Sequence, residues 1–387
     1  MTTAALAVLL LVAGLAAHHG LRDLRTLPTG PSSRGAAPPS AVSVVVPARD
    51  EERGIGHLIG SLAPLEDPVG EVLVVDDGSR DATAEVARAR GAVVLAAGPP
   101  PPGWTGKAWA CRVGTEASSG DLLLFLDADV TLAPGAVAAL LEQHSRSGGL
   151  VSVQPFDDVR RPHEQLAAHL HLVPLLASGA FRARPTRPPM AFGPCLLVSR
   201  SDLERAGGHA AVRGDVLDDV GLALAHDRAG LSVTCAVGGD LVRMRSHPEG
   251  LGRLVAGFTK NIASGAGATS PRTLVPTLAW LCAQHAVAVG ALAALLAALA
   301  PGRFPEPAGG PVLWALAWPA TAHQLRHLLR RVGSFRWWTW AIFPVPLLVF
   351  DAVFLASLVR TLGGSVRWRG RVVPVRGRPD ADGGPAC

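Results

Sequence analysis

An uncharged run over residues 274–300 constrains the fold of this chain more than any other feature. A membrane-spanning helix needs about 20 consecutive apolar residues, so this run is long enough to cross a bilayer. Charged residues make up only 17% of the chain, below the roughly 25% that is typical of soluble domains. The sequence therefore predicts contact with a membrane, with a soluble helical bundle as the alternative.

A second apolar run lies at the N-terminus, over residues 4–17. No Lys or Arg precedes it, which argues against a cleaved signal peptide. We therefore expect residues 1–27 to form an uncleaved membrane anchor, with a buried or interfacial helix as the alternative. Because Arg22, Arg25 and Arg34 follow the run, the positive-inside rule places the next segment in the cytoplasm.

Two more apolar runs, over residues 311–325 and 337–358, complete a predicted region of transmembrane or interfacial helices at 266–362. A basic tail at 363–387 follows it. Seven of the nine Trp lie in or beside this region, as expected for side chains that anchor at a membrane interface. If every run crossed once, the basic tail would lie outside, against the charge rule. One run is therefore predicted to be re-entrant or interfacial, either 311–325 or the run that contains Pro344 and Pro346.

Other classes of protein fit poorly. Five Cys lie far apart without a CxxC pair, which excludes a disulfide scaffold or a zinc ribbon. The chain has a net charge of +5, but the positive charge flanks the apolar runs instead of covering a folded domain. No nucleic-acid partner is therefore predicted.

Strands and helices alternate between the anchors. A linker rich in Pro, Gly and Ser is expected at 28–40, before a domain at 41–265. Apolar strands are predicted at 41–46, 71–75, 92–95 and 122–126, with helices at 51–62 and 82–90 between them. This alternation predicts an α/β domain with a doubly wound, Rossmann-like sheet, in which ligands bind at the carboxyl ends of the strands.

Acidic side chains follow two of these strands. Asp127 and Asp129 come directly after the strand at 122–126, and in an extended segment they share one face. Together they can reach one divalent cation, although an Asp-x-Asp sequence is also common in solvated turns. Asp76 and Asp77 end another strand. The two groups suggest a site for a nucleotide diphosphate.

Lysine and a second acidic pair add to this pattern. Lys107 and Lys260 are the only lysines among 36 basic residues, which indicates positions that need a compact ammonium group. Asp218 and Asp219 open a predicted helix at 220–229. They could act as a general base or only as partners of the helix dipole. His163, His169 and His171 have no recognised metal spacing and are interpreted as structural.

These motifs, in this order, resemble the family 2 glycosyltransferases: Val44-Val45-Val46-Pro47-Ala48-Arg49-Asp50-Glu51-Glu52, Asp76-Asp77-Gly78-Ser79, Gly106-Lys107, Asp127-x-Asp129 and Asp218-Asp219. The resemblance implies a GT-A fold, a nucleotide-diphospho-sugar donor, an Mg²⁺ or Mn²⁺ ion and inversion at the anomeric carbon. It implies donor-binding roles for Pro47, Asp50, Glu51, Asp76, Asp77, Lys107 and Asp127. It also implies metal ligation by Asp127 and Asp129, and a base at Asp219 with Asp218 beside it.

Within the family, Gly103-Trp104-Thr105-Gly106-Lys107-Ala108-Trp109-Ala110 is similar to a branch of carotenoid-acid and hopanoid-associated enzymes. Trp104, Lys260 and Asn261 would then lie on the acceptor side, and a helix at 250–262 would lie on the membrane or in an ordinary core. Cys111 stands where many members have Asn, and Asp218 replaces the commoner Glu. The Q-x-x-R-W motif of processive synthases is missing, which favours a single transfer.

The sequence thus leads to a set of expectations about function. We expect a multi-pass protein of the cell membrane with a cytoplasmic catalytic domain that contacts membrane lipids. It would transfer one sugar, glucose from UDP-glucose, to a lipid-soluble acceptor. A carotenoid acid is the favoured acceptor, and a hopanoid or a sphingolipid-type alcohol is the alternative. A catalytically inactive membrane scaffold is the alternative of another class.

Overall fold

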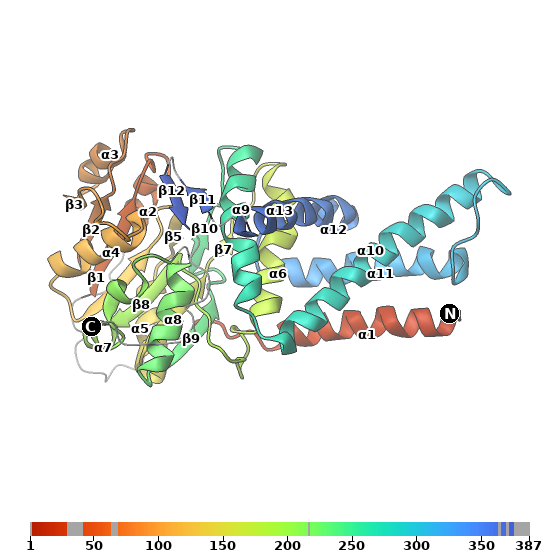
Figure 1. Ribbon diagram of the computed structural model, residues 1–387, viewed down its shortest axis with the longest axis horizontal. Coiled ribbons are helices and arrows are strands. Elements are labelled where there is room, and N and C mark those ends of the chain that lie inside the picture. The colour runs from red at the N-terminus through yellow and green to blue at the C-terminus, as the bar shows by residue number, and fades with distance from the viewer. Residues whose placement is uncertain are drawn as a thin grey trace, which may run out of the picture.

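A computed structural model of the chain describes residues 2–28, 42–62, 69–215, 217–362, 365–368 and 371–374. The predicted linker, apart from Pro28, and the end of the basic tail lie outside these residues. The chain forms a sheet-containing domain at one end of the molecule, and long helices extend from it along the longest axis (Figure 1).

The domain is built on a seven-stranded sheet whose first half was predicted from the sequence. Its order is β3 (Val93–Ala96), β2 (Val69–Asp76), β1 (Val42–Ala48), β4 (Leu122–Leu126), β8 (Cys195–Ser199), β6 (Leu150–Gln154) and β9 (Val233–Val237). β1 pairs in parallel with β2 and β4, and its β-branched run is buried as expected for a central parallel strand. β8, however, runs antiparallel to β4 and β6, so the sheet is mixed.

Helices cover both faces of this sheet, as the α/β prediction requires. α2 (Ile55–Leu62), α3 (Thr83–Ala89) and α5 (Ala136–Ser147) pack into one apolar core. α4 (Gly106–Ala117), α7 (Arg200–Arg205) and α8 (Asp218–Arg228) pack into the other. α2 starts four residues later than predicted, because Glu51 begins a turn whose carbonyl accepts from the N–H groups of Gly54 and Ile55.

A smaller sheet and short segments lie at the carboxyl edge of the main sheet. The smaller sheet has the order β5 (Val130–Leu132), β10 (Val242–Met244) and β7 (Phe156–Asp157). The short elements are η1 (Glu164–Ala167), η2 (Gly208–Val212) and a hairpin of β11 (Ser365–Trp368) and β12 (Arg371–Pro374).

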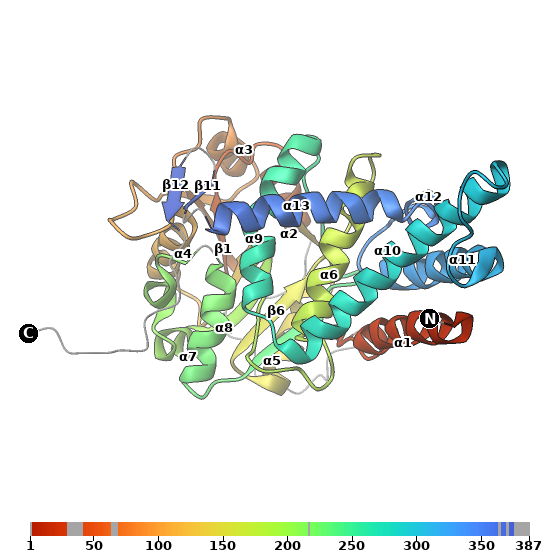
Figure 2. The same cartoon turned by 45° about the vertical axis from the view of Figure 1, so that its right-hand side comes forward.

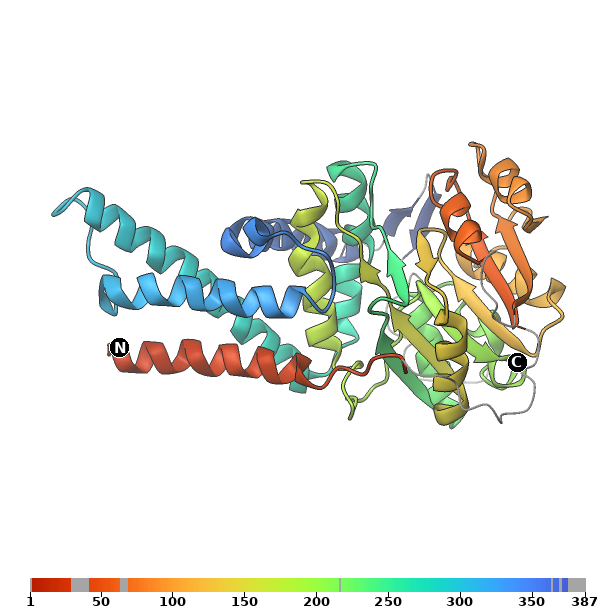
Figure 3. The same ribbon diagram turned by 180° about the vertical axis from the view of Figure 1, so that it is seen from behind.

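The remaining helices form what we call the helical module. α1 (Thr3–Arg22), α10 (Pro271–Leu299) and α11 (Gly310–Leu329) extend side by side away from the sheet (Figures 1 and 3). α6 (Ala168–Ser178) and α9 (Leu251–Gly267) lie between them and the sheet. α13 (Pro344–Leu362) crosses α9, with the short α12 (Trp337–Ala341) before it (Figure 2). One apolar core joins these helices.

Three of the described helices are long and apolar enough to cross a membrane: α1, α10 and residues Pro344–Thr361 of α13. Their outward faces carry apolar side chains. On α1, for example, Val8, Leu9 and Leu11 are each more than half exposed. Large exposed apolar surfaces are rare on soluble proteins, so these faces indicate membrane association.

The apolar run at 337–358, which Pro344 and Pro346 were expected to interrupt, forms two helices. α12 ends at Ala341 and α13 starts at Pro344. Proline lacks an N–H group and restricts the residue before it, so it fits the first position of a helix and not the interior.

Candidate active site

One large cavity connects the sheet edge with the helical module. Its volume is about 1220 Å³, and it extends from the carboxyl ends of β1 and β4 to helices α6, α9, α10 and α13. Cavities that hold one small ligand are typically about 300–1000 Å³. This cavity therefore has room for two ligands that meet. Its polar end is lined by Pro47, Asp50, Glu51, Asp77, Lys107, Asp127, Asp129, Asp218 and Asp219.

The Asp127–Asp129 loop lies at the centre of the polar end. β4 ends at Leu126, and both carboxylates then line the cavity while Ala128 between them is buried. Gly54 allows the turn before α2 to approach this loop, because a Cβ atom there would lie 2.8 Å from the carbonyl oxygen of Ala128. Lys107 Nζ lies 2.8 Å from Asp127 Oδ1.

Lys107 is held at the start of α4. The Thr105 side chain caps this helix by accepting from the N–H group of Ala108. Burial alone would lower the pKa of Lys107, but the carboxylates of Asp127 and Asp218 hold that pKa well above its ordinary value. The side chain is therefore a permanent cation in the polar end of the cavity.

Asp129 sits among other carboxylates. Burial, and then the charges of Asp127 and Glu51, raise its pKa from 3.8 to about 8. Three acidic groups therefore lie close together. Carboxylate oxygens are hard ligands, which suit Mg²⁺ or Mn²⁺. Within the described ranges, no three His, Cys, Asp or Glu residues could hold an ion by themselves. An ion here would need further oxygens from a substrate or from water.

Asp218 and Asp219 occupy the first turn of α8, where the sequence placed them. Asp219 Oδ2 accepts from the N–H group of Gly193 at 2.8 Å, and Oδ1 accepts from that of Val220 at 2.9 Å. Burial, and then the charge of Asp218, raise the pKa of Asp219 to about 6. A carboxylate with such a pKa can accept a proton near neutrality.

Gly193 lies beside both Asp219 and Lys107. A Cβ atom at this position would lie 3.3 Å from both Asp219 Oδ2 and Lys107 Nζ. The glycine therefore lets the ammonium and the carboxylate approach the same point of the cavity.

The structure separates two of the predicted site residues from this cavity. Asp76 does not line it, and its Oδ1 accepts from the backbone N–H of Ser79 at 3.0 Å. Trp104 does not line it either. It packs edge-on against Trp109, with the guanidinium of Arg112 over its ring. Their sequence-derived roles in donor and acceptor binding remain predictions that no contact with the cavity supports.

The two acceptor-side residues on α9 differ. Lys260 lines the cavity, and burial lowers its pKa below the ordinary value. Asn261 belongs to α9, but its side chain lies outside the described part of the chain.

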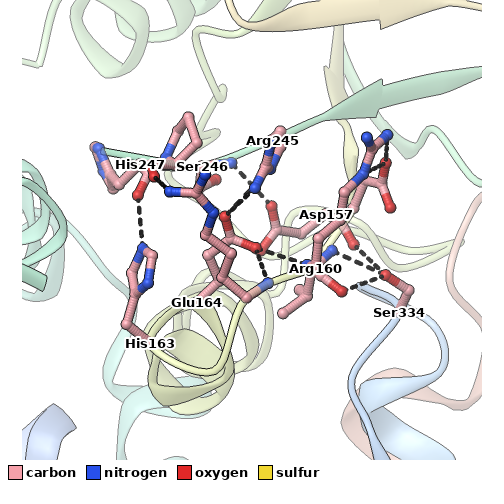
Figure 4. A network of polar contacts seen from close by, with 12 residues as sticks. Asp157, Arg160, His163, Glu164, Arg245, Ser246, His247 and Ser334 are labelled. Atoms are coloured by element: carbon pink, nitrogen blue, oxygen red, sulfur yellow. Dashed lines mark hydrogen bonds and ion pairs between the residues drawn. The ribbon is translucent and has the colours of Figure 1, made fainter. Parts of the chain in front are cut away.

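A polar network beside the cavity was missed in the sequence (Figure 4). Glu164 Oε2 accepts from the backbone N–H groups of Arg160 and Arg161, and Oε1 accepts from the guanidinium of Arg245 at 2.8 Å. Asp157 Oδ1 accepts from the N–H group of Ser246. The network ties the loop after β7 to the loop after β10, and more than 80 residues separate its two sides.

The network places three arginines and a histidine on the cavity wall. Arg160, Arg161, Arg245 and His247 all line it. His247 has a φ of 53°, in the left-handed region that non-glycine residues rarely adopt. Such conformations concentrate at functional sites, but the sequence carries no local signal for them.

One histidine that was interpreted as structural also lines the cavity. His171 on α6 lies with its Nε2 3.1 Å from Asp157 Oδ2. His171 therefore contacts the last residue of β7 and also lines the cavity. His169 is buried against Gln284 and Trp280, in agreement with a structural role.

The mixed sheet and the carboxylates at its edge fit an enzyme of the GT-A fold, and comparisons with known proteins identify its family. A model of the family described as "Glycosyl transferase family 2" matches residues 43–207. The chain is 33% identical over 338 residues to 4,4'-diaponeurosporenoate glycosyltransferase of Staphylococcus aureus strain MRSA252, covering 86% of this chain and 88% of that protein. It is 32% identical, with the same coverage, to the protein of that name from strain USA300. The chain therefore belongs to glycosyltransferase family 2.

A solved structure shares the fold over nearly the whole chain. The mannosyltransferase PcManGT from Pyrobaculum calidifontis, determined with GDP-Man and Mn²⁺, superimposes with a TM-score of 0.53 at 20% identity. The match covers 93% of this chain and 96% of that one. At this identity the likeness concerns the fold, and it includes the helical module as well as the sheet.

Proposed function

We propose that this glycosyltransferase transfers one glucose from UDP-glucose to a lipid-soluble acceptor, a carotenoid acid such as 4,4'-diaponeurosporenoate. One observation carries the proposal: a single cavity joins the carboxylates that suit a nucleotide sugar to a wall of membrane-type helices. The names of the S. aureus relatives support this acceptor. A hopanoid or a sphingolipid-type alcohol would use the same cavity and is the second candidate.

The donor occupies the polar end. Asp127 and Asp129 would hold an Mg²⁺ or Mn²⁺ ion, and such an ion would supply positive charge to the diphosphate leaving group. Lys107 adds a fixed positive charge beside Asp127. Pro47, Asp50, Glu51 and Asp77 line the adjoining wall, where the nucleoside would lie.

Transfer at this site is a single displacement with inversion. The acceptor oxygen bonds to the anomeric carbon of glucose, and the bond from that carbon to the diphosphate oxygen breaks. The acceptor proton passes to Asp219, whose raised pKa suits a base that works near neutral pH. An apolar environment disfavours the charged form of a carboxyl group, so a carotenoid acid arrives protonated. Like an alcohol, it then gives its proton to Asp219.

The acceptor reaches the site from the helical module. Leu170 and Leu175 on α6, Phe258 on α9 and Leu281 on α10 form part of the apolar wall. A long apolar chain held there would bring its reacting end to Asp219 without leaving a lipid-like environment. Holding donor and acceptor together in this way lowers the entropic barrier to transfer.

We further propose that α1, α10 and α11 cross the cell membrane and that α13 lies in its interface. This departs from apolar length alone, by which α13 qualifies as a span and α11 does not. These three helices run side by side, whereas α13 packs on α9 next to the catalytic domain. Arg326, Arg330 and Arg331 then lie at the domain end of α11, on the cytoplasmic side. The described hairpin of β11 and β12, which follows α13, is also placed on the cytoplasmic side by this arrangement, in agreement with the positive-inside rule.

Purified membranes that contain the protein should convert 4,4'-diaponeurosporenoate to a product heavier by one hexose when UDP-glucose and Mg²⁺ are supplied. Mass spectrometry of the lipid extract measures this product. GDP-mannose in place of UDP-glucose tests the donor, and a triterpenoid alcohol tests the acceptor. If none of these pairs gives a glycosylated lipid, the inactive-scaffold alternative stands and the proposed function is wrong.

Metal binding should change how stability depends on pH. Asp129 has a pKa of about 8 in the folded chain against 3.8 as its ordinary value, so without metal its contribution is most favourable below about pH 4. That contribution is lost as pH rises through 8. The thermal unfolding temperature of the metal-free protein should therefore fall over this range, and Mn²⁺ should raise it most at pH 8.

Asp129→Asn should remove the part of the fall between about pH 6 and 8, above the pKa of Asp219, and it should remove the stabilisation by Mn²⁺. Asp121→Asn changes an exposed carboxylate just before β4 and should leave both unchanged. Equal stabilisation of the wild type and Asp129→Asn by Mn²⁺ would contradict the proposed metal site.

A further inference from the structure

The cavity ends in the helical module at a pair of ionisable side chains. His285 on α10 and Asp351 on α13 both line it, with His285 Nε2 2.7 Å from Asp351 Oδ2. On α10 the lining begins at Leu274 and does not continue beyond His285, although the described helix runs on to Leu299. Because α10 leads away from the sheet domain, the pair lies in the part of the cavity that the helical module forms.

The pair stands out chemically from its surroundings. Leu278 and Leu281 on α10 and Phe350 and Phe354 on α13 line the same part of the cavity. Ionisable groups inside apolar helices are costly, and where they occur they commonly mark a functional site. If the pair only linked α10 to α13, its side chains would not need to be accessible. Both side chains, however, are 40% exposed.

The hydrogen bonds of the pair define what it can bind. His285 Nδ1 lies 2.8 Å from the carbonyl oxygen of Leu281, so Nδ1 carries a proton and donates it. One further proton lies between Nε2 and Asp351 Oδ2. Within the described residues, no donor contacts the other oxygen, Asp351 Oδ1, which is left as an acceptor. A ligand that meets this oxygen should present a hydroxyl group.

We propose that His285 and Asp351 form a second polar subsite, which binds a hydroxyl group at the far end of an elongated acceptor. The inference rests on the proposed function, since it takes the apolar part of the cavity as the acceptor site. It adds a substrate class to that function: rod-shaped lipids that are polar at both ends, one end reacting beside Asp219 and the other held between α10 and α13.

Binding of two matched polyenes tests the subsite without the donor. The probes are 4,4'-diaponeurosporenoate and the same acid with a hydroxyl group on its opposite end, and quenching of tryptophan fluorescence in detergent reports the dissociation constant. The wild type should bind the hydroxylated acid about tenfold more tightly, as expected for a hydrogen bond to a charged group.

The double variant His285→Leu/Asp351→Leu should lose this preference and keep the affinity for the unsubstituted acid. Both partners are replaced because a single change would leave an unpaired charge. His323→Leu, an exposed histidine on α11 outside the cavity, is the matched control and should keep the preference.

Two results would overturn the subsite: equal affinity of the wild type for both acids, or an unchanged preference in the double variant. A double variant that binds neither acid would also contradict it if its unfolding temperature matched that of the wild type. If that variant unfolds, Asp351→Asn is used in its place. This change weakens the hydrogen-bond acceptor at residue 351 but keeps the shape of the side chain, so it should reduce the preference for the hydroxylated acid. The binding test uses no donor and does not depend on sugar transfer. A failure of the proposed function and a failure of the proposed subsite can therefore be told apart.

Discussion

Asp129→Asn should abolish sugar transfer, with a loss of about 10³-fold or more, while the chain stays folded. The substitution removes one of two carboxylates that can hold the divalent ion, and an ion of this kind contributes several kcal/mol to stabilising the leaving group. Initial rates of hexose transfer in membranes measure the loss. Asp121→Asn is the matched control, because it changes an exposed carboxylate at the start of the same strand region.

The folded state of Asp129→Asn should be at least as stable as that of the metal-free wild type above pH 8. Burial and neighbouring carboxylates oppose ionisation of Asp129, and the neutral amide removes that penalty. Retained transfer in a folded Asp129→Asn protein would contradict metal-assisted departure of the nucleotide.

Asp219→Asn should lower kcat by about 10²- to 10⁴-fold, the range that a positioned general base contributes. In the wild type, kcat/KM should rise with pH through about 6 and level off above it, because only the ionised carboxylate accepts the proton. The substitution should remove this rise. Initial rates are measured across a pH series at saturating donor and over a range of acceptor concentrations. They give kcat and, for the acceptor, kcat/KM at each pH.

Asp227→Asn is the control for this experiment. Asp227 lies at the other end of α8 and pairs with the exposed Arg187 at the surface, so loss of this ion pair should change the rate little. Full activity of the wild type at pH 5, or an unchanged pH profile in Asp219→Asn, would show that Asp219 is not the base.

Much of the fold could be predicted because its signals are local. The buried β-branched run of β1 and the strand–helix alternation after it define the first half of the sheet. The antiparallel β8 was missed because strand direction depends on how the chain returns after α6, and pairing between distant strands leaves no local pattern. The interruption at Pro344 was expected from the sequence, and α13 begins at this residue, because its ring disfavours a helix that continues through it.

The candidate site shows the same division. Asp127, Asp129 and Asp219 were identified from motifs, and they share one cavity. The Glu164–Arg245 contact joins loops that are far apart in the sequence, so only the tertiary structure reveals it. Asp76 and Trp104 were predicted from motif position alone. Neither lines the cavity, and their roles stay predictions.

The cavity lies between the sheet domain and the helical module, and this position explains why the chain combines the two. A soluble sugar nucleotide and a lipid-soluble acceptor occupy different phases, and an enzyme that joins them needs one site open to both. The sheet edge supplies carboxylates and Lys107, and the helical module supplies an apolar wall. The proposed subsite at His285 and Asp351 would set which lipids fit that wall.

An experimental structure with UDP, Mn²⁺ and a polyene acid bound together tests this account most directly. The account predicts the diphosphate and the ion at Asp127 and Asp129, with the carboxyl end of the acid beside Asp219. The polyene should follow the cavity between α6, α9 and α10. A polyene bound on the outer face of the helices, with its carboxyl group remote from Asp219, would contradict it.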